Sequence, residues 1–265
     1  MMENLTPITP EIHRLVVPFI DIYTTVHIVK TPDGDLLFDT ATYPEDMDNY
    51  IFPALEELGV TAESLKYVFI SHNHRDHAGG LGRFLEKYPK TCVLSRSADL
   101  KEKYSGYQVE CLEDGAPILD ILRIVTIPGH TMDCAAIYDT RSKTLLTGDC
   151  LQLYGIYGSG QWGANIGLPV LHIEAVEKLR TLDIETIVAS HNYHPCDYMA
   201  KGRAQILRYF HECTDPLYRV RDNIARNPEA SDEELTAQYN EGGKLPTMAV
   251  RITTAIRKAM AEGLM

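Results

Sequence analysis

The sequence predicts an α/β protein whose strands and helices form layers up to about residue 195, followed by a helical tail. Three observations support this prediction. Apolar runs typical of buried strands alternate with segments whose apolar residues recur at helical spacing, and no repeat or low-complexity linker interrupts them. Beyond residue 195 the patterns are helical alone. With 265 residues, 45% of them hydrophobic, the chain can bury a substantial core.

Strands are expected near the N-terminus, over residues 13–20, 24–31 and 34–40. The sequence TPDG joins the last two and favours a turn, because Pro32 and Gly34 suit turn conformations. A helix is expected next, where Ile51 and Leu55 recur at helical spacing and Gly59 suits the helix end. Its range is residues 44–60.

The alternation continues through the middle of the chain. Further strands are expected at residues 64–71, 91–95, 122–129, 134–140, 143–149 and 185–191. Helices are expected between them, at residues 79–89, 97–105 and 170–182.

Four helices are expected in the tail, at residues 198–212, 216–227, 231–240 and 246–263. The third has Ser231 at its N-cap and Glu234 three residues later, which is the pattern of a capping box. We therefore predict a main α/β domain over residues 1–195 and a helical extension over residues 196–265. The extension is expected to cover the core domain or to shape its cleft.

Composition narrows the classes of function. The formal net charge is -12 and no lysine- or arginine-rich run occurs, so nucleic acid is not an expected partner. The six cysteines are scattered without CxxC spacing and are expected to be reduced. No apolar run approaches the roughly 20 residues of a membrane span, and the N-terminus lacks the order of a signal peptide. We expect a cytoplasmic protein with a small-molecule substrate and no membrane partner, and consider a homodimer because of the tail.

A cluster of metal-binding side chains follows the expected strand over residues 64–71, in the stretch SHNHRDHAGG. His72 and His74 lie two residues apart, so in an extended backbone both can reach one ion. Asp76 and His77 fall on the turn into the next helix and can face a second ion. Zinc binds imidazole and carboxylate groups, but each ion needs about four ligands, so this cluster is insufficient alone.

Further candidate ligands stand at the ends of three other expected strands. His130 ends RIVTIPGH, Asp149 ends TLLTGD and His191 ends ETIVASH. In α/β folds the carboxyl ends of strands are where functional sites are built. The recurrence of this placement indicates that these side chains complete the metal site.

These motifs, SHNHRDHAGG, PGHT, GD and a late SH in this order, resemble the metallo-β-lactamase superfamily over about the first 195 residues. In LLFDT, Asp39 matches an early aspartate of the family that supports the ligands. The resemblance implies a four-layer αββα sandwich with a C-terminal helical appendage. It also implies two divalent ions. Zinc is the leading candidate, with manganese or iron as alternatives. The first ion is assigned to His72, His74 and His130, the second to Asp76, His77 and His191, and Asp149 bridges them.

The expected function is a metal-dependent hydrolase that uses a metal-bridging hydroxide on a small carboxylic ester, lactone or thioester. One alternative is a phosphodiesterase on the same two-metal site. Another is a mononuclear iron oxygenase such as a persulfide dioxygenase, which needs only His72, His74 and His130. Glyoxalase II and persulfide dioxygenases usually continue PGHT with glycine and histidine, whereas this chain has Met132 and Asp133 there.

Other candidates have weaker support. Asp76, Asp149 and His194 are the expected catalytic residues, with His194 as a donor to the substrate oxygen or, alternatively, a capping or solvent-facing histidine. The loop over residues 151–169 is rich in glycine and aromatic residues. Its aromatic side chains either line the substrate pocket or pack beneath the loop; they are Tyr154, Tyr157 and Trp162.

Overall fold

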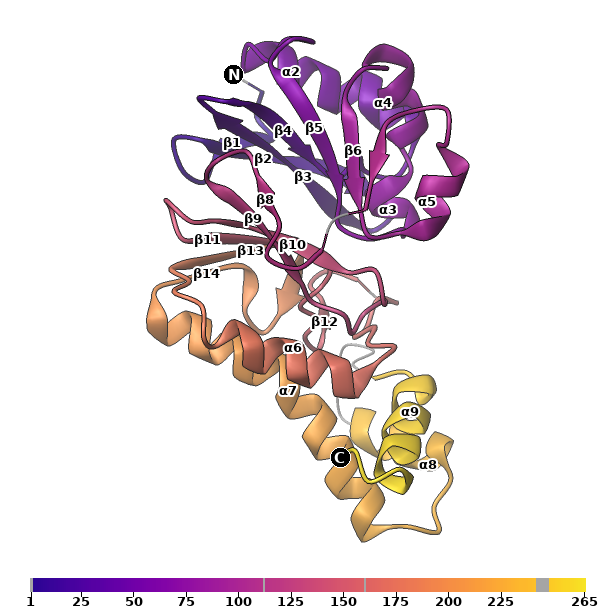
Figure 1. Ribbon diagram of the computed structural model, residues 1–265. Helices are drawn as coiled ribbons and strands as arrows, with labels where there is room; N and C mark the ends of the chain where they lie inside the picture. The colour runs from indigo at the N-terminus through magenta and orange to yellow at the C-terminus, as the bar shows by residue number, and fades with distance from the viewer. Residues whose placement is uncertain (1, 112, 160, 242–247) are drawn as a thin grey trace. The chain divides into compact units, whose positions relative to one another are not determined.

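The computed structural model describes residues 2–111, 113–159, 161–241 and 248–265, and their helices and strands are labelled in Figure 1. The chain forms two compact units. The first comprises Met1–Thr126 and Ala135–Ser142, and the second comprises Ile127–Cys134 and Lys143–Met265.

The first unit is built on a seven-stranded mixed sheet. Its strands, in spatial order, are β1 (Leu5–Pro7), β2 (Ile12–Phe19), β3 (Ile22–Thr31), β4 (Gly34–Phe38), β5 (Leu65–Ile70), β6 (Cys92–Ser95) and β7 (Val109–Glu110). β1 to β4 pair antiparallel, whereas β4 to β7 pair parallel. Because β4 and β5 are parallel neighbours, the segments that leave their carboxyl ends meet at one edge of the sheet.

Helices cover one face of this sheet. They are α1 (Pro44–Asp46), the π-helix η1 (Met47–Ile51), α2 (Phe52–Glu57), α3 (Arg75–Ala78), α4 (Leu81–Lys87) and α5 (Ala98–Lys103). Ile51, Leu55 and Phe84 share one buried core with strand residues such as Val26 and Val68. Figure 1 shows α2 and α4 on the same side of the sheet.

The expected helix at residues 44–60 forms, but its middle turn is π-helical. Pro53 explains the wider turn, since proline has no N–H to give to the carbonyl four residues earlier and its ring crowds that carbonyl. A short antiparallel ribbon completes the unit, made of β8 (Pro117–Ile118), β9 (Leu122–Thr126) and β10 (Ala135–Asp139).

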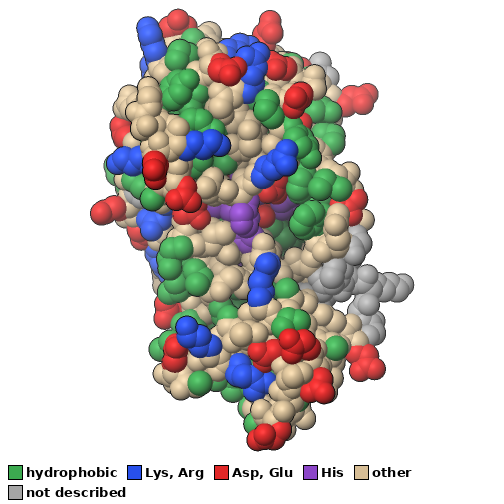
Figure 2. All heavy atoms as spheres, turned by 90° about the vertical axis from the view of Figure 1, so that its right-hand side faces the viewer, with side chains coloured by type: hydrophobic (Ala, Val, Ile, Leu, Met, Phe, Trp, Pro, Cys, Tyr) green, Lys and Arg blue, Asp and Glu red, His purple; other side chains and the backbone are tan. Residues whose placement is uncertain are grey.

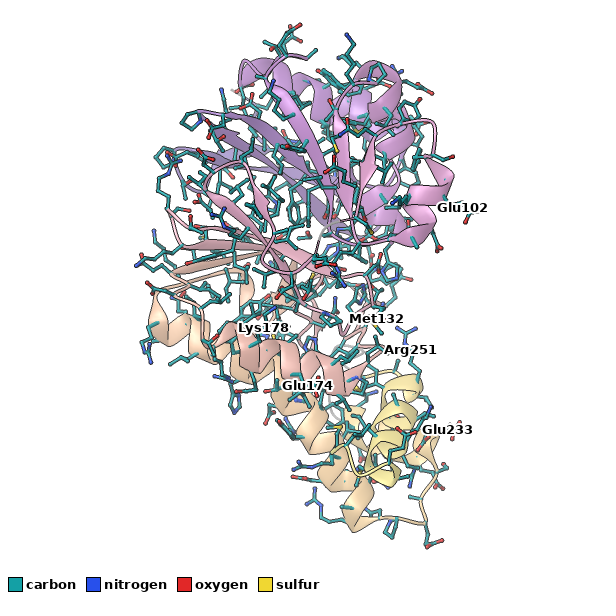
Figure 3. The ribbon with its side chains drawn as sticks, viewed as in Figure 1. Glu102, Met132, Glu174, Lys178, Glu233 and Arg251 are labelled. Atoms are coloured by element: carbon teal, nitrogen blue, oxygen red, sulfur yellow. The ribbon has the colours of Figure 1, made fainter. Side chains whose placement is uncertain are left out.

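The second unit is organised around a long strand. Its strands are β11 (Thr144–Gly148), β12 (Gly155–Ile156), β13 (Thr186–His194) and β14 (Asp197–Lys201). β13 pairs parallel with β11 and antiparallel with β12 and β14. Its helices are α6 (Pro169–Leu179), α7 (Arg203–Arg226), α8 (Asp232–Asn240) and α9 (Val250–Ala261). On α6, Val176 and Leu179 are buried, whereas Glu174 projects outward in Figure 3.

The beginning of the tail differs from the prediction of a helix at residues 198–212. The chain first forms β14, because this segment pairs with β13 over residues 186–188. A single α7 then replaces the two expected helices and runs through Pro216. Leu217 and Val220, beyond the proline, are buried in the same core as Ile252 of α9. Their burial offsets the roughly 3 kcal/mol that an interior proline costs a helix.

The remaining tail helices agree with their patterns. In α8, Ser231 Oγ accepts from Glu234 N at 3.2 Å and Glu234 accepts from Ser231 N at 2.9 Å, which confirms the capping box. Pro246 and Thr247, at the start of the last expected helix, lie outside the described residues. Both units combine mixed sheets with helices, as the predicted α/β class requires. The division at residue 195 stays a prediction.

Candidate functional site

The first unit brings Asp39 beside the histidine cluster. Asp39 follows β4 and Ser71 follows β5, and these strands are parallel neighbours. The Asp39 carboxylate accepts hydrogen bonds from Ser71 N at 2.8 Å, Ser71 Oγ at 2.9 Å and His77 Nδ1 at 2.7 Å. Burial raises the pKa of Asp39, and the contacts with His77 and Ser71 oppose that rise. Asp39 therefore fixes both the end of β5 and the ring of His77.

Four predicted ligands lie together in this unit. His72 and His74 offer ring nitrogens within 4.8 Å of each other, and their rings lie 4.6 Å apart. The His72 and His77 rings lie 4.3 Å apart. Asp76 Oδ2 lies 3.3 Å from His77 Nε2. These four side chains therefore lie close together, and their role as metal ligands stays a prediction.

Two glycines after the cluster allow the chain to lie close to the loop after β4. A β-carbon at Gly79 would lie 1.9 Å from the carbonyl oxygen of Thr42, and one at Gly80 would lie 2.3 Å from that of Thr40. Both distances are far below van der Waals contact, so no other residue fits without a shift of the backbone. The loop is tied down on its other side by Thr40, whose N and Oγ1 donate to the His77 carbonyl at 2.7 and 3.0 Å.

The second unit brings the other three predicted ligands together. Asp149 directly follows β11, and His191 lies in the parallel neighbour β13. Asp149 Oδ1 lies 3.3 Å from His191 Nε2, and Asp149 Oδ2 lies 3.9 Å from His130 Nε2. All three residues are buried, with relative exposures of 6% or less. His191 does not end its strand as predicted, because β13 continues to His194.

Residues that the sequence patterns did not indicate form hydrogen bonds with two of these predicted ligands. Tyr193 OH donates to Asp149 Oδ1 at 2.9 Å. Gln152 Nε2 donates to the Asp149 carbonyl and to Tyr193 OH, at 3.0 Å each, and its Oε1 accepts from Asn165 N at 3.1 Å. The Asn165 carbonyl in turn accepts from His130 Nδ1 at 2.5 Å.

The protonation pattern of the imidazoles fits a cation site. His77 Nδ1 and His130 Nδ1 donate to a carboxylate and a carbonyl. Ser71 Oγ donates to Asp39, so it accepts at 3.1 Å from His72 Nδ1. Each Nε2 then carries a lone pair, and that of His77 faces a carboxylate oxygen at 3.3 Å. Imidazoles bind metals in this form, with the other nitrogen donating to a protein acceptor.

The loop aromatics take different positions from one another. Tyr154 OH donates to Asp215 of α7 at 2.9 Å, and burial together with this carboxylate raises the pKa of Tyr154. Tyr157 is 43% exposed, and its ring lies 5.0 Å from that of His194. Trp162 is half-buried, and its backbone N–H donates to Ser159 Oγ at 2.9 Å. Tyr154 thus anchors the loop to the tail, and Tyr157 is the aromatic side chain that borders a cavity.

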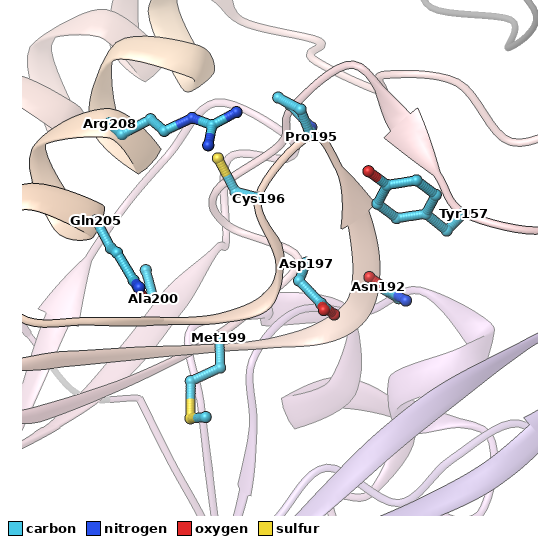
Figure 4. Close-up of a pocket in the computed structure, with 9 residues that line it drawn as sticks. All are labelled: Tyr157, Asn192, Pro195, Cys196, Asp197, Met199, Ala200, Gln205 and Arg208. Carbon is cyan, nitrogen blue, oxygen red and sulfur yellow. The ribbon is translucent and has the colours of Figure 1, made fainter.

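That cavity, of about 610 Å³, lies within the second unit between the β13–β14 turn and α7 (Figure 4). Its lining includes the Tyr157 phenol, the Asn192 amide, the Asp197 carboxylate and the Arg208 guanidinium. Charges of both signs therefore border one space. Its size is within the range of small-molecule pockets.

Surface charge is mixed. On the face drawn in Figure 2, lysine and arginine side chains are scattered among acidic ones. Among the described helices, none combines the length and apolar character needed to cross a bilayer. The expected cytoplasmic location and the homodimer stay predictions.

Comparison with known proteins identifies relatives. The sequence model of the metallo-beta-lactamase superfamily matches residues 21–191, more than half of the chain. A hydroxyacylglutathione hydrolase from a Synechococcus species is 30% identical over 159 residues, and the match covers 58% of this chain and 60% of that protein. Another from Nostoc punctiforme is 28% identical over 144 residues, covering 53% and 56%. The matches thus span less than two thirds of these relatives.

Solved structures support the same fold. A metallo-beta-lactamase family protein from Thermus thermophilus has a TM-score of 0.67 at 18% identity, covering 97% of this chain and 95% of that chain. A flavo di-iron protein from Thermotoga maritima has a TM-score of 0.63 at 17% identity, covering 88% and 69%. The fold class that the ligand motifs predicted is confirmed.

Proposed function

The chain belongs to the metallo-beta-lactamase superfamily, and we propose that it is a metal-dependent hydrolase of a small carboxylic ester, lactone or thioester. The observation that supports this proposal is the state of the buried imidazoles. Three of them direct their Nδ1 to protein acceptors, which leaves Nε2 free of a proton. Carboxylates beside Nε2 supply the charge that a divalent cation needs.

We assign the two sets of side chains to one pair of cations. In this proposal the ligands are His72, His74 and His130 for the first cation, Asp76, His77 and His191 for the second, and Asp149 for both. Two bound divalent ions, with zinc as the leading candidate, would lower the pKa of a bound water to about 7. Asp76 would accept a proton from the attacking water, and His194 would donate to the substrate oxygen.

A thioester is the preferred substrate class among the three. The relatives are named for a hydroxyacyl thioester of glutathione, a peptide thiol with charged ends. The cavity beside β14 suits a leaving group of this kind, because Arg208 can bind a carboxylate and Asp197 an ammonium group. We therefore place the polar leaving group in this cavity.

The experiment is to measure metal content and hydrolysis in the purified protein and in Asp149→Ala. The proposal predicts two divalent ions per chain and thioester hydrolysis in the wild type, with hydrolysis abolished and at most one ion retained in the variant. Asp139→Ala is the control: Asp139 is also a buried aspartate at a strand end, but it binds Ser142 Oγ at 2.8 Å in a turn. This control should lose stability and keep both ions.

Other outcomes would redirect the assignment. One iron per chain with oxygen consumption on a persulfide would replace hydrolysis by a dioxygenase. Cleavage of phosphodiesters but of no acyl substrate would indicate the phosphodiesterase alternative. Full activity in Asp149→Ala would refute the bridging role.

A further inference from the structure

A buried hydrogen-bonded network connects two of the proposed ligands with the C-terminal helices. Its centre is Gln152, which is 2% exposed and lies three residues after Asp149. Gln152 uses its amide in three hydrogen bonds, as a donor to the Asp149 carbonyl and Tyr193 OH and as an acceptor from Asn165 N. We propose that Gln152 is a positioning residue that fixes the carboxylate of Asp149 and the imidazole of His130 for metal binding.

The first arm of the network orients the Asp149 carboxylate. Tyr193, 1% exposed, receives a hydrogen bond from Gln152 and donates its own hydroxyl hydrogen to Asp149 Oδ1 at 2.9 Å. Because the phenol oxygen accepts from the amide, its hydrogen is directed to the carboxylate. Gln152 thus selects the hydrogen-bond direction as well as the position of Tyr193.

The second arm orients the His130 ring. Gln152 Oε1 holds Asn165 N, and the Asn165 carbonyl accepts from His130 Nδ1. A carbonyl at this nitrogen requires the Nδ1–H tautomer and leaves Nε2 as the ligand atom. Displacing Asn165 would release both the ring orientation and the tautomer.

The tail supports the second arm from outside. Ala164 and Ile166, on either side of Asn165, are buried in one cluster with Ile252 of α9. Arg251, labelled in Figure 3 in the first turn of α9, donates to Asn165 Oδ1. The Arg251 side chain is exposed, so its hydrogen bond contributes less to the position of Asn165 than the hydrogen bond of buried Gln152 does. The C-terminal helices therefore contribute to the site through Asn165.

The experiment measures zinc affinity by chelator competition in Gln152→Leu, Tyr193→Phe and Arg251→Met. Replacing a residue that holds a metal ligand typically lowers metal affinity about 10–100-fold, and we expect this for Gln152→Leu. Tyr193→Phe should also weaken binding, and Arg251→Met should have the smallest effect. A second readout is the ¹⁵N spectrum of His130 in metal-free protein, which should change from one Nδ1–H tautomer to a mixture in Gln152→Leu.

Two controls separate positioning from general stability. Tyr209→Phe also removes a buried hydroxyl, one without a hydrogen-bond partner among the described residues. Arg257→Met loosens α9 at Asp232, away from Asn165. Both should keep wild-type zinc affinity. The proposal would be overturned if each control lost as much zinc affinity as its counterpart. It would also be overturned if folded Gln152→Leu kept the wild-type zinc affinity and the wild-type tautomer of His130. If Gln152→Leu does not fold, the zinc affinity of Tyr193→Phe decides.

This inference rests on the proposed metal site, yet it can fail separately from it. A wild-type protein that hydrolyses no acyl substrate would overturn the proposed function. The zinc and tautomer measurements would still determine whether Gln152 positions the ligands.

Discussion

The burial of His27 allows us to predict how the stability of the first unit depends on pH. This residue lies in β3, is fully buried and packs edge-on against Phe38 with ring centroids 5.7 Å apart. Neither ring nitrogen has a hydrogen-bond partner among the described residues. Burial lowers the pKa of His27 to about 3, and the charge of Arg14 adds to the shift. The folded protein therefore keeps this imidazole neutral at any pH well above 3.

The sign and size of the effect follow from proton linkage. Between the folded pKa of about 3 and the unfolded value of 6.5, the unfolded chain binds a proton that the folded chain does not. Stability is thus fully present above the unfolded pKa and falls as pH is lowered. From pH 7 to pH 5 the loss is about 2 kcal/mol, since each pH unit below the unfolded pKa costs about 1.4 kcal/mol.

The assay is urea unfolding of wild type and His27→Leu at pH 7, 6 and 5 in the presence of a metal chelator. Other titrating groups are common to both proteins, so the difference in unfolding free energy isolates His27. It should shift by about 2 kcal/mol in favour of the variant between pH 7 and pH 5. His211→Leu, which replaces an exposed histidine of α7, should leave the pH dependence as in wild type. Parallel pH profiles for wild type and His27→Leu would refute the reasoning.

Three further predictions concern the site and its surroundings. Asp39→Ala leaves three buried hydrogen-bond donors without their acceptor, so calorimetry should show a lower Tm. Chelator competition should show zinc binding about 10–100-fold weaker. Unchanged zinc affinity would contradict the supporting role of Asp39. Gly80→Ala should cost about 1–3 kcal/mol in urea unfolding because its β-carbon meets Thr40, whereas Gly82→Ala, with nothing nearer than 3.5 Å, should be neutral or stabilising. Arg208→Ala should raise KM for thioesters with a carboxylate on the leaving group and leave kcat unchanged; an equal rise for uncharged thioesters would remove Arg208 from substrate binding.

The sequence predicted the strands well where a local pattern carried them. The apolar run over residues 64–71 forms β5, and the side chains of residues 72–77 gather after it because the strand ends there. The capping box at Ser231 is also a local pattern. Both depend on neighbours in the chain, which the sequence displays directly.

The supporting network was missed for physical reasons. Asn165 acts on His130 through its backbone carbonyl, which any residue type possesses. Gln152 lies in an irregular loop, where a buried amide has no distinguishing pattern. Tyr193 could have been found, because it lies two residues after His191 on a strand and hence on the same face. β14 and the unbroken α7 depend on tertiary pairing and burial, which outweighed the local preferences around Gly202 and Pro216.

The close approach of Gly79 and Gly80 to the segment at residues 40–42 matters for protein engineering. The stretch of residues 72–77, which carries four of the proposed ligands, is short enough to be grafted onto another scaffold as a candidate metal-binding cassette. Without both glycines and a loop shaped to receive them, a β-carbon at residue 79 or 80 would collide with a backbone carbonyl of the loop and displace the histidines. A transferable cassette therefore extends to residue 80 and includes the receiving loop, although residues 40–42 are not among the proposed ligands.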